Sequence, residues 1–406
     1  MTKYIKFFLL GLFMATFASS CKTNEKEAPT KSVGLSADTL ALATKKMHEY
    51  VDEGKLAGIS TLVVKDGEVV HRDRIGFVDI ANKKQVADSS IYRIFSMTKP
   101  ITAVAMMRLY DEGKIALDDK VSKYIPAFAD TQVYAEVDGK HGSEPQGTEM
   151  TLRHLMTHTS GIVYGWAESY TDSVYATKNF MGVDRPVLEM AEDLATVPLK
   201  FQPGTKWEYG LGIDVAGAVV EVASGQPLDQ YFKTTIFDPL GMDDTAFYVP
   251  TEKDERLAEL YQRTEEGKLE PNEAMRSRNA GTPPKLFLGG AGLVSTIGDY
   301  EKFCRMLLNK GTLDGNRILS EQAVQLIMTN QLPEGVAFEE GEGYGLSGSV
   351  KLSTGEYAWG GAASTNFWID PKNDLIVICY TQLFPGDHSY AEEFKEIVDQ
   401  SLVNSK

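Results

Sequence analysis

A serine and a lysine three residues apart, Ser96 and Lys99 in the string S-M-T-K, form the most informative chemical pattern in the sequence. Positions i and i+3 of a helix lie on one face, about 5–6 Å apart at Cβ, so the lysine amine can reach the serine oxygen. The pair therefore predicts a nucleophilic serine assisted by an amine. The same short pattern also occurs at Ser19 and Lys22, so further residues must support it.

The residues around Ser96 predict a strand followed by a helix. The apolar run 91–95 is typical of a short strand, and apolar residues then recur at helical spacing from Ile101 to a stop at Gly113. Pro100 fits the first helical turn, whose N–H groups have no partner within the helix. We therefore expect Ser96 at a helix N-terminus, where partial positive charge favours an attacking oxygen and a developing oxyanion.

Tyr209 lies within a second segment of chemical interest, P-G-T-K-W-E-Y-G-L-G at 203–212. Reference pKa values of about 10 for tyrosine and about 10.4 for lysine make either residue a poor base in water. In a partly dry site the ammonium favours the phenolate, so Lys99 and Tyr209 together can take the serine proton. The alternative is an aromatic residue that only anchors its loop.

The third segment is Y-A-W-G-G-A-A-S at 357–364, in an expected strand. Gly360 and Gly361 weaken a strand and are usually found where a ligand or another backbone approaches closely. We interpret this strand as the edge along which a substrate lies. A β-bulge would explain the same glycines.

Other chemistries have weaker patterns. His154 and His158 have the i, i+4 spacing of a zinc site, but Leu155 replaces the glutamate of H-E-x-x-H. We expect these histidines to pack or to bond loops, and we expect no metal and no cofactor. The sequence has no G-x-S-x-G, and 289–292 lacks the spacing of a phosphate-binding loop.

The first 21 residues resemble a bacterial lipoprotein signal. A basic start is followed by the apolar run 7–18 and by small residues before Cys21. This resemblance implies that 1–20 is cleaved, that Cys21 is lipidated and that the protein is exported and anchored in an envelope membrane, periplasmic or on the cell surface. The polar stretch 21–34 is expected to be a flexible tether. An ordinary secretory signal is the alternative.

The composition and charge of the chain indicate which kinds of partner it can bind and how it folds. The net charge of −16, without a basic stripe, argues against nucleic acid. With 43% hydrophobic residues the chain can bury a large core. Beyond Cys21, Cys304 and Cys379 fall in apolar patterns and are expected to be small buried residues; whether they form a disulfide stays open.

The remaining patterns predict an α+β protein. An amphipathic segment at 40–51 precedes a hairpin at 60–71, which turns at Asp66 and Gly67. Later strands are expected at 344–352, 356–359, 365–369 and 375–382, before a last helix at 389–402. We predict one antiparallel sheet flanked by helices, from 35–95 and 285–402. The stretch 96–284, with helical patterns at 151–158, 213–223 and 227–237, is expected to be a mostly helical inserted subdomain.

Taken together, the three segments resemble the superfamily of serine β-lactamases and penicillin-binding proteins, whose signatures include S-x-x-K and a strand motif of the K-T-G type. The match is closest to class C β-lactamase-like hydrolases and family VIII carboxylesterases, with support from 152–161 and 289–296. The resemblance implies a β-lactamase/transpeptidase-like fold for 35–402. It also implies Ser96 as the acylated nucleophile, Lys99 and Tyr209 as the proton-transfer pair, and the N–H groups of Ser96 and Ala362 as the oxyanion hole.

Two departures from the family pattern concern the expected substrate-binding residues Trp359, Gly360, Gly361 and Leu211. Members that recognise lactams usually carry a cation at the position of Trp359 and an asparagine at that of Leu211. Both positions are apolar here, which favours small esters over lactams, although an arginine elsewhere could compensate. The alternatives are a β-lactamase, a D-amino-acid peptidase, or a non-catalytic module that binds penicillin or peptidoglycan.

Overall fold

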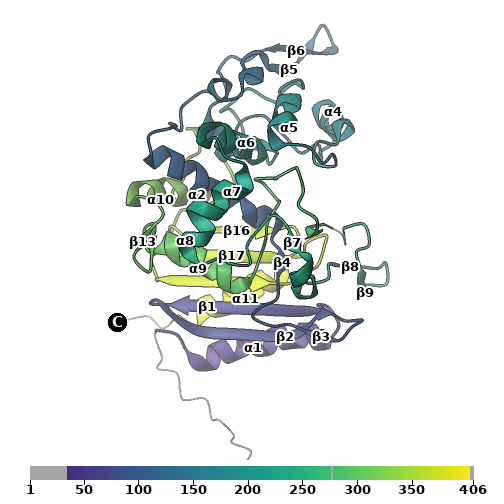
Figure 1. Ribbon diagram of the computed structural model, residues 1–406, viewed down its shortest axis with the longest axis vertical. Helices are drawn as coiled ribbons and strands as arrows, with labels where there is room; N and C mark the ends of the chain where they lie inside the picture. Colours follow the sequence, from purple (N-terminus) through teal and green to yellow (C-terminus); the bar gives the residue numbers. More distant parts are fainter. Residues whose placement is uncertain (1–33, 276–277, 403–406) are drawn as a thin grey trace, which may run out of the picture. The chain divides into compact units, whose positions relative to one another are not determined.

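Residues 34–275 and 278–402 are described by a computed structural model of the chain (Figure 1). The predicted signal 1–20, Cys21 and all but the last residue of the tether therefore lie outside the described residues. Within the described ranges, no helix combines the length and the apolar character needed to cross a bilayer.

An antiparallel sheet of eight strands combines the beginning and the end of the chain. Its strand order is β14 (Glu342–Tyr344), β15 (Ser349–Lys351), β16 (Tyr357–Gly361), β17 (Thr365–Asp370), β18 (Leu375–Tyr380), β1 (Gly58–Lys65), β2 (Glu68–Asp79) and β3 (Lys84–Gln85). The first strand pairs with the last, with Ser60 opposite Tyr380. The predicted antiparallel α+β sheet is confirmed.

The hairpin of β1 and β2 turns where the sequence predicts. Asp66 and Gly67 both have positive φ, 52° and 76°, as two-residue hairpin turns require. The two strands extend beyond the predicted range 60–71 because β2 continues to Asp79, where it also pairs with β3.

Helices cover both faces of the sheet. The helices α1 (Ala37–Asp52) and α11 (Ser389–Gln400) pack against each other on one face, and α9 (Ile297–Leu308) contacts β1, β17 and β18 from the other. Ser36 begins α1 by accepting a hydrogen bond from the Thr39 N–H. The terminal helices thus lie where the sequence predicts.

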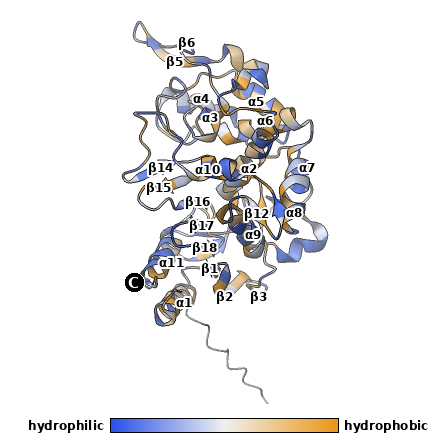
Figure 2. Cartoon of the chain, turned by 90° about the vertical axis from the view of Figure 1, so that its left-hand side faces the viewer, coloured by the Kyte–Doolittle hydropathy of each residue, from blue (hydrophilic) through white to orange (hydrophobic). Residues whose placement is uncertain are grey.

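The helix α2 (Thr98–Asp111) lies between the sheet and the helical part of the chain (Figures 1 and 2). It contacts α6 (Gly212–Ser224) and α10 (Glu321–Met328). Eleven of its 14 residues are buried. The other helices are α3 (Leu152–Met156), α4 (Tyr170–Lys178), α5 (Val187–Leu194), α7 (Leu228–Phe232) and α8 (Asp238–Leu240).

The elements at 342–351, 227–237 and 132–145 differ from the prediction. The expected strand 344–352 is a hairpin of β14 and β15, because Gly345 and Gly348 form a turn closed by the Gly345 N–H and the Gly348 carbonyl (2.8 Å). The expected helix 227–237 becomes a π-helical turn after α7. The hairpin of β5 (Gln132–Val137) and β6 (Lys140–Pro145) was not predicted, although Asp-Gly at 138–139 marks its turn.

Both cysteines of the described part are free. Cys304 in α9 is fully buried, and Cys379 in β18 is 1% exposed. They are the small buried residues that the sequence predicts, and they do not pair.

Candidate active site

Ser96 lies in a short 3-10 turn (Phe95–Met97) that runs directly into α2. The expected strand 91–95 is shorter, because β4 (Tyr92–Arg93) pairs with β11 (Val294–Ser295) over two residues only. The chain then turns at Phe95, whose φ of 41° is unusual for a bulky side chain. Ser96 therefore precedes the α-helix instead of opening it. It is partly exposed, whereas Phe95 and Met97 are buried.

Lys99 is fully buried and bonds Ser96 Oγ from within α2. Its Nζ donates hydrogen bonds to Ser96 Oγ (3.1 Å), to the Gly290 carbonyl (2.7 Å) and to Tyr164 Oη (3.3 Å). An ammonium has three N–H donors, so each has a partner. This arrangement satisfies a buried charge that would otherwise be costly.

Tyr209 approaches Ser96 from the loop before α6. Its hydroxyl donates to Ser96 Oγ at 2.8 Å, and Lys99 Nζ lies 4.5 Å from the centre of its ring. Gly210 allows this approach, because a Cβ there would lie 2.0 Å from the Ile162 carbonyl oxygen. The structure thus brings Ser96, Lys99 and Tyr209 together within hydrogen-bond distance.

Asp214 in α6 bonds the same residue, Gly290, that Lys99 bonds. Its Oδ1 accepts a hydrogen bond from the Gly290 N–H (2.8 Å), and the Gly290 carbonyl is the one that Lys99 binds. Asp214 is fully buried, and its Oδ2 has no hydrogen-bond partner among the described residues. Burial raises the pKa of this carboxyl, while Lys99 and Arg278 oppose the rise.

Burial also sets the protonation of two aromatic neighbours. It raises the pKa of Tyr164 well above the usual value, so this phenol stays neutral and accepts from Lys99. It lowers the pKa of His158 well below the usual value, and His158 Nδ1 accepts from the Gly210 N–H (3.3 Å). His158 therefore positions the Tyr209 loop as a neutral side chain.

The strand β16 runs past the turn that carries Ser96. A Cβ on Gly361 would lie 2.3 Å from the Ile94 carbonyl oxygen, so only glycine permits this contact. The contact places the backbone of Ala362 beside the segment that carries Ser96. The close approach that the sequence predicts for these glycines is to another backbone.

Aromatic side chains surround Tyr209. Trp359 lies 5.6 Å from the Tyr209 ring and meets Tyr344 edge to face at 5.3 Å. Trp207 adds a further ring, 6.3 Å from Tyr209. Trp166, 71% exposed, stacks on Tyr164 at 4.1 Å. Trp359 thus faces Tyr209 with an apolar surface.

The other two expected substrate-binding residues have different surroundings. Leu211 is 2% exposed and packs in the main core cluster, so the structure does not bring it to the solvent-facing side of the site. A Cβ on Gly360 would meet Asn366 and His388 and not the group around Ser96.

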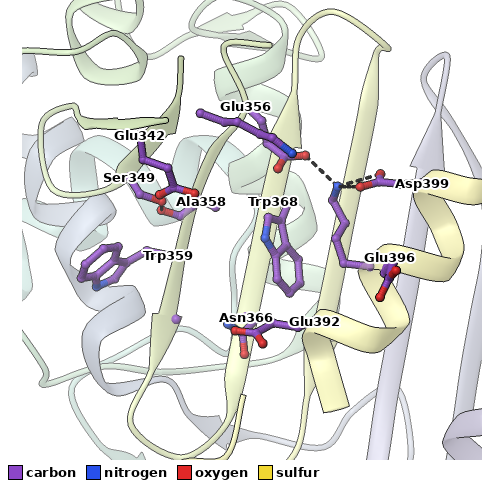
Figure 3. Close-up of a pocket in the computed structure, with 13 residues that line it drawn as sticks. Glu342, Ser349, Glu356, Ala358, Trp359, Asn366, Trp368, Glu392, Glu396 and Asp399 are labelled. Atoms are coloured by element: carbon purple, nitrogen blue, oxygen red, sulfur yellow. Dashed lines mark hydrogen bonds and ion pairs between the residues drawn. The ribbon is translucent and has the colours of Figure 1, made fainter. Parts of the chain in front are cut away.

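A separate cavity of about 410 Å³ lies between α11 and the sheet edge near Trp359 (Figure 3). Five carboxylates line it: Glu342, Glu356, Glu392, Glu396 and Asp399. Lys395 pairs with Glu356 and Asp399, each at 2.7 Å. Ser96, Lys99 and Tyr209 do not line this cavity. Its negative charge gives no support to a substrate carboxylate at Trp359.

The two histidines at zinc spacing bind backbone groups instead. His154 Nδ1 accepts from the Thr151 N–H (3.2 Å) in the capping box of α3, and His158 bonds Gly210. In the described residues, no group of three or more His, Cys, Asp or Glu side chains is placed to hold a metal.

Sequence reasoning did not identify Tyr164, Asp214, Gly290 or Arg278 as parts of the site. Tyr164 follows the string 152–161, and Asp214 lies five residues after Tyr209. Both residues are therefore close in sequence to the motifs that resemble the family. Arg278 had no sequence signal, because its position depends on how the loop before β10 (Ala280–Gly281) folds back.

Comparisons with known proteins identify the family of the chain. The family model described as Beta-lactamase matches residues 43–401. An uncharacterized protein of Mycobacterium tuberculosis is 34% identical over 360 residues, covering 84% of this chain and 89% of the relative. Lovastatin esterase of Penicillium rubens is 30% identical over 389 residues, with coverages of 85% and 94%.

Among solved structures, EstCE1, described as a hydrolase with promiscuous acyltransferase activity, superposes with a TM-score of 0.74. It shares 25% identity, and the alignment covers 89% of this chain and 98% of that one. The match of the family model over most of the chain, together with this fold, shows that the chain belongs to the Beta-lactamase family of serine enzymes.

Proposed function

We propose that the chain is a serine hydrolase that cleaves small esters through an acyl-enzyme. Ser96 Oγ attacks the ester carbonyl, and its proton passes to the pair of Tyr209 and Lys99. The alcohol leaves with a proton returned by this pair, and water then attacks the acyl group by the same route. The N–H groups of Ser96 and Ala362 are proposed to stabilise the oxyanion.

The observation that carries this proposal is the double contact on Ser96 Oγ, from Tyr209 at 2.8 Å and Lys99 at 3.1 Å. Lys99 Nζ lies 4.5 Å from the centre of the Tyr209 ring, so both members of the proposed proton-transfer pair lie at the same hydroxyl. A binding module without turnover would have no need of this arrangement.

The aromatic surface at Trp359 favours esters over lactams. A lactam carboxylate directed there would lose its solvation and find no cation, at a cost of about 1.5–3 kcal/mol relative to a charge-assisted contact. A neutral acyl or alcohol group would instead gain apolar contact with Trp359 and Tyr344.

The test compares kcat/KM for p-nitrophenyl butyrate and nitrocefin on the same purified chain. We expect the ester to be the better substrate, and we expect Trp359→Lys to shift the ratio toward the lactam. A wild-type preference for nitrocefin would establish a β-lactamase instead, and turnover of neither substrate would leave a binding module.

We also propose that the protein is exported and anchored to a membrane through lipid on Cys21. The support is the sequence of residues 1–21 alone. Metabolic labelling with a tagged fatty acid should mark the wild-type protein and not Cys21→Ser. Equal labelling of both proteins would contradict the anchor.

A further inference from the structure

Arg278 is a cation beside the nucleophile that the mechanism above does not use. Its guanidinium carbon lies 5.1 Å from the centre of the Phe95 ring, the residue directly before Ser96. Its Nη2 donates to the Ala291 carbonyl (3.2 Å), next to the Gly290 that Lys99 binds. These two contacts place the guanidinium beside the Phe95 ring and the backbone that follows Gly290.

The backbone of Arg278 is held from both sides. Arg93 donates its Nε–H to the Arg278 carbonyl (2.9 Å). The side chain of the next residue, Asn279, donates to the carbonyls of Phe247 and Gly292, each at 2.8 Å. The guanidinium is therefore presented by an anchored segment, which reduces the conformational cost of binding a ligand.

Most of the hydrogen-bonding capacity of Arg278 is unused. A guanidinium has five N–H donors, and among the described residues the side chain of Arg278 donates one hydrogen bond and forms no ion pair. Its side chain is only partly exposed. A partly buried guanidinium that bonds no carboxylate directly within the described residues is suited to a bidentate contact with a small planar anion.

The charges around the site favour an anion as well. Lys99 and Arg278 are the cations that interact with Asp214, whose Oδ1 already bonds Gly290. Tyr164, which also faces Arg278, stays neutral because burial raises its pKa. Two cations thus face one carboxylate, which leaves a net positive charge for the substrate to neutralise.

We propose that Arg278 binds a carboxylate on the substrate, so that the preferred esters carry a free acid remote from the ester bond. This inference rests on the proposed function and deepens it, because it names the substrate class. It is compatible with the apolar surface at Trp359, since the carboxylate would bind beside Phe95 and not at β16.

The test uses three esters on the full-length protein. p-Nitrophenyl glutarate carries the carboxylate on the acyl side, 3-butyryloxybenzoate carries it on the alcohol side, and p-nitrophenyl butyrate is neutral. In Arg278→Met, kcat/KM for one of the two acidic esters, relative to the neutral ester, should fall by about 10- to 100-fold, the scale of a lost charge-assisted contact. Arg278→Lys should recover part of this ratio.

The matched control is Lys372→Met, which removes one positive charge from the exposed turn between β17 and β18. Its ratios should equal those of the wild type. Unchanged ratios in Arg278→Met for both acidic esters would overturn the proposal. Each ratio compares two esters on the same enzyme preparation, so a partial loss of folded protein does not affect it.

Failure of the proposed function would be visible separately, as absence of turnover with all three esters. Calorimetric titration with glutarate would then still test whether Arg278 binds a carboxylate. Binding to the wild type that is lost in Arg278→Met supports the anion site, whereas no binding, or equal binding to both, overturns it.

Discussion

Gly290→Ala should impair both catalysis and stability, because Gly290 links Asp214 to Lys99. A Cβ at position 290 would lie 2.5 Å from Asp214 Oδ2 and 3.0 Å from its Cγ, both fully buried. Such overpacking typically costs about 1–3 kcal/mol, or about 2–10 °C in Tm. Relief of the clash must move Gly290, and its carbonyl holds Lys99 at 2.7 Å. A displacement of about 1 Å in a catalytic group can lower kcat by about 10²-fold.

The assay is kcat for p-nitrophenyl butyrate together with a thermal melt, and Gly298→Ala is the matched control. A Cβ at position 298, in α9, would meet only Thr296 Oγ1, at 4.0 Å. This variant should keep the wild-type kcat and gain up to about 1 kcal/mol, because alanine favours a helix. A Gly290→Ala protein with wild-type kcat and Tm would refute the link from Asp214 to Lys99.

The other predictions concern the proton-transfer pair, the buried acid and pH. Lys99→Ala and Tyr209→Phe should each lower kcat by about 10²–10⁴, and the double variant should lose less than the product of the single losses, as measured by steady-state kinetics. Asp214→Asn keeps an acceptor for the Gly290 N–H but removes a charge near Lys99. This variant should shift the pH profile of kcat/KM and leave Tm within a few degrees of the wild type. An unchanged pH profile would assign Asp214 a packing role only. Burial lowers the pKa of His71, so between about pH 6.5 and the lower pKa of the folded state the unfolded chain binds a proton that the folded chain does not. The free energy of unfolding from urea titrations should therefore fall by up to about 1.4 kcal/mol per pH unit on acidification, and by less in His71→Gln; parallel losses in both proteins would contradict this assignment.

The sheet could be predicted from the sequence because its strands show local signals. Asp66 and Gly67 supply the two positive φ values of a hairpin, and β18 is a run of apolar residues buried on both faces. The sequence pattern does not predict the division of 342–351 into two strands, because Gly345 and Gly348 fall within a pattern that is typical of one continuous strand. The turn there also depends on a remote contact, since a Cβ on Gly345 would lie 2.2 Å from the Ile327 carbonyl oxygen.

The proximity of Ser96 and Lys99 could be predicted from the sequence for a different reason. Ser96 and Lys99 are close along the chain, so the geometry of one turn already places them together. Asp214 and Arg278 were not accessible, because their roles depend on tertiary contacts with Gly290 and Phe95 that no local pattern encodes. Leu211 illustrates the reverse case: its alignment with a family position predicted a substrate-binding residue, whereas the structure packs it in the main core cluster.

The most direct test of the central claim is to identify the residue that becomes acylated. The chain is treated with a fluorophosphonate or quenched during turnover of a slow ester, and the modified peptide is mapped by mass spectrometry. The arrangement of Lys99 and Tyr209 around a single hydroxyl predicts a stoichiometric adduct on Ser96 and none on Ser96→Ala. An adduct at another residue, or persistent labelling and ester turnover in Ser96→Ala, would contradict it.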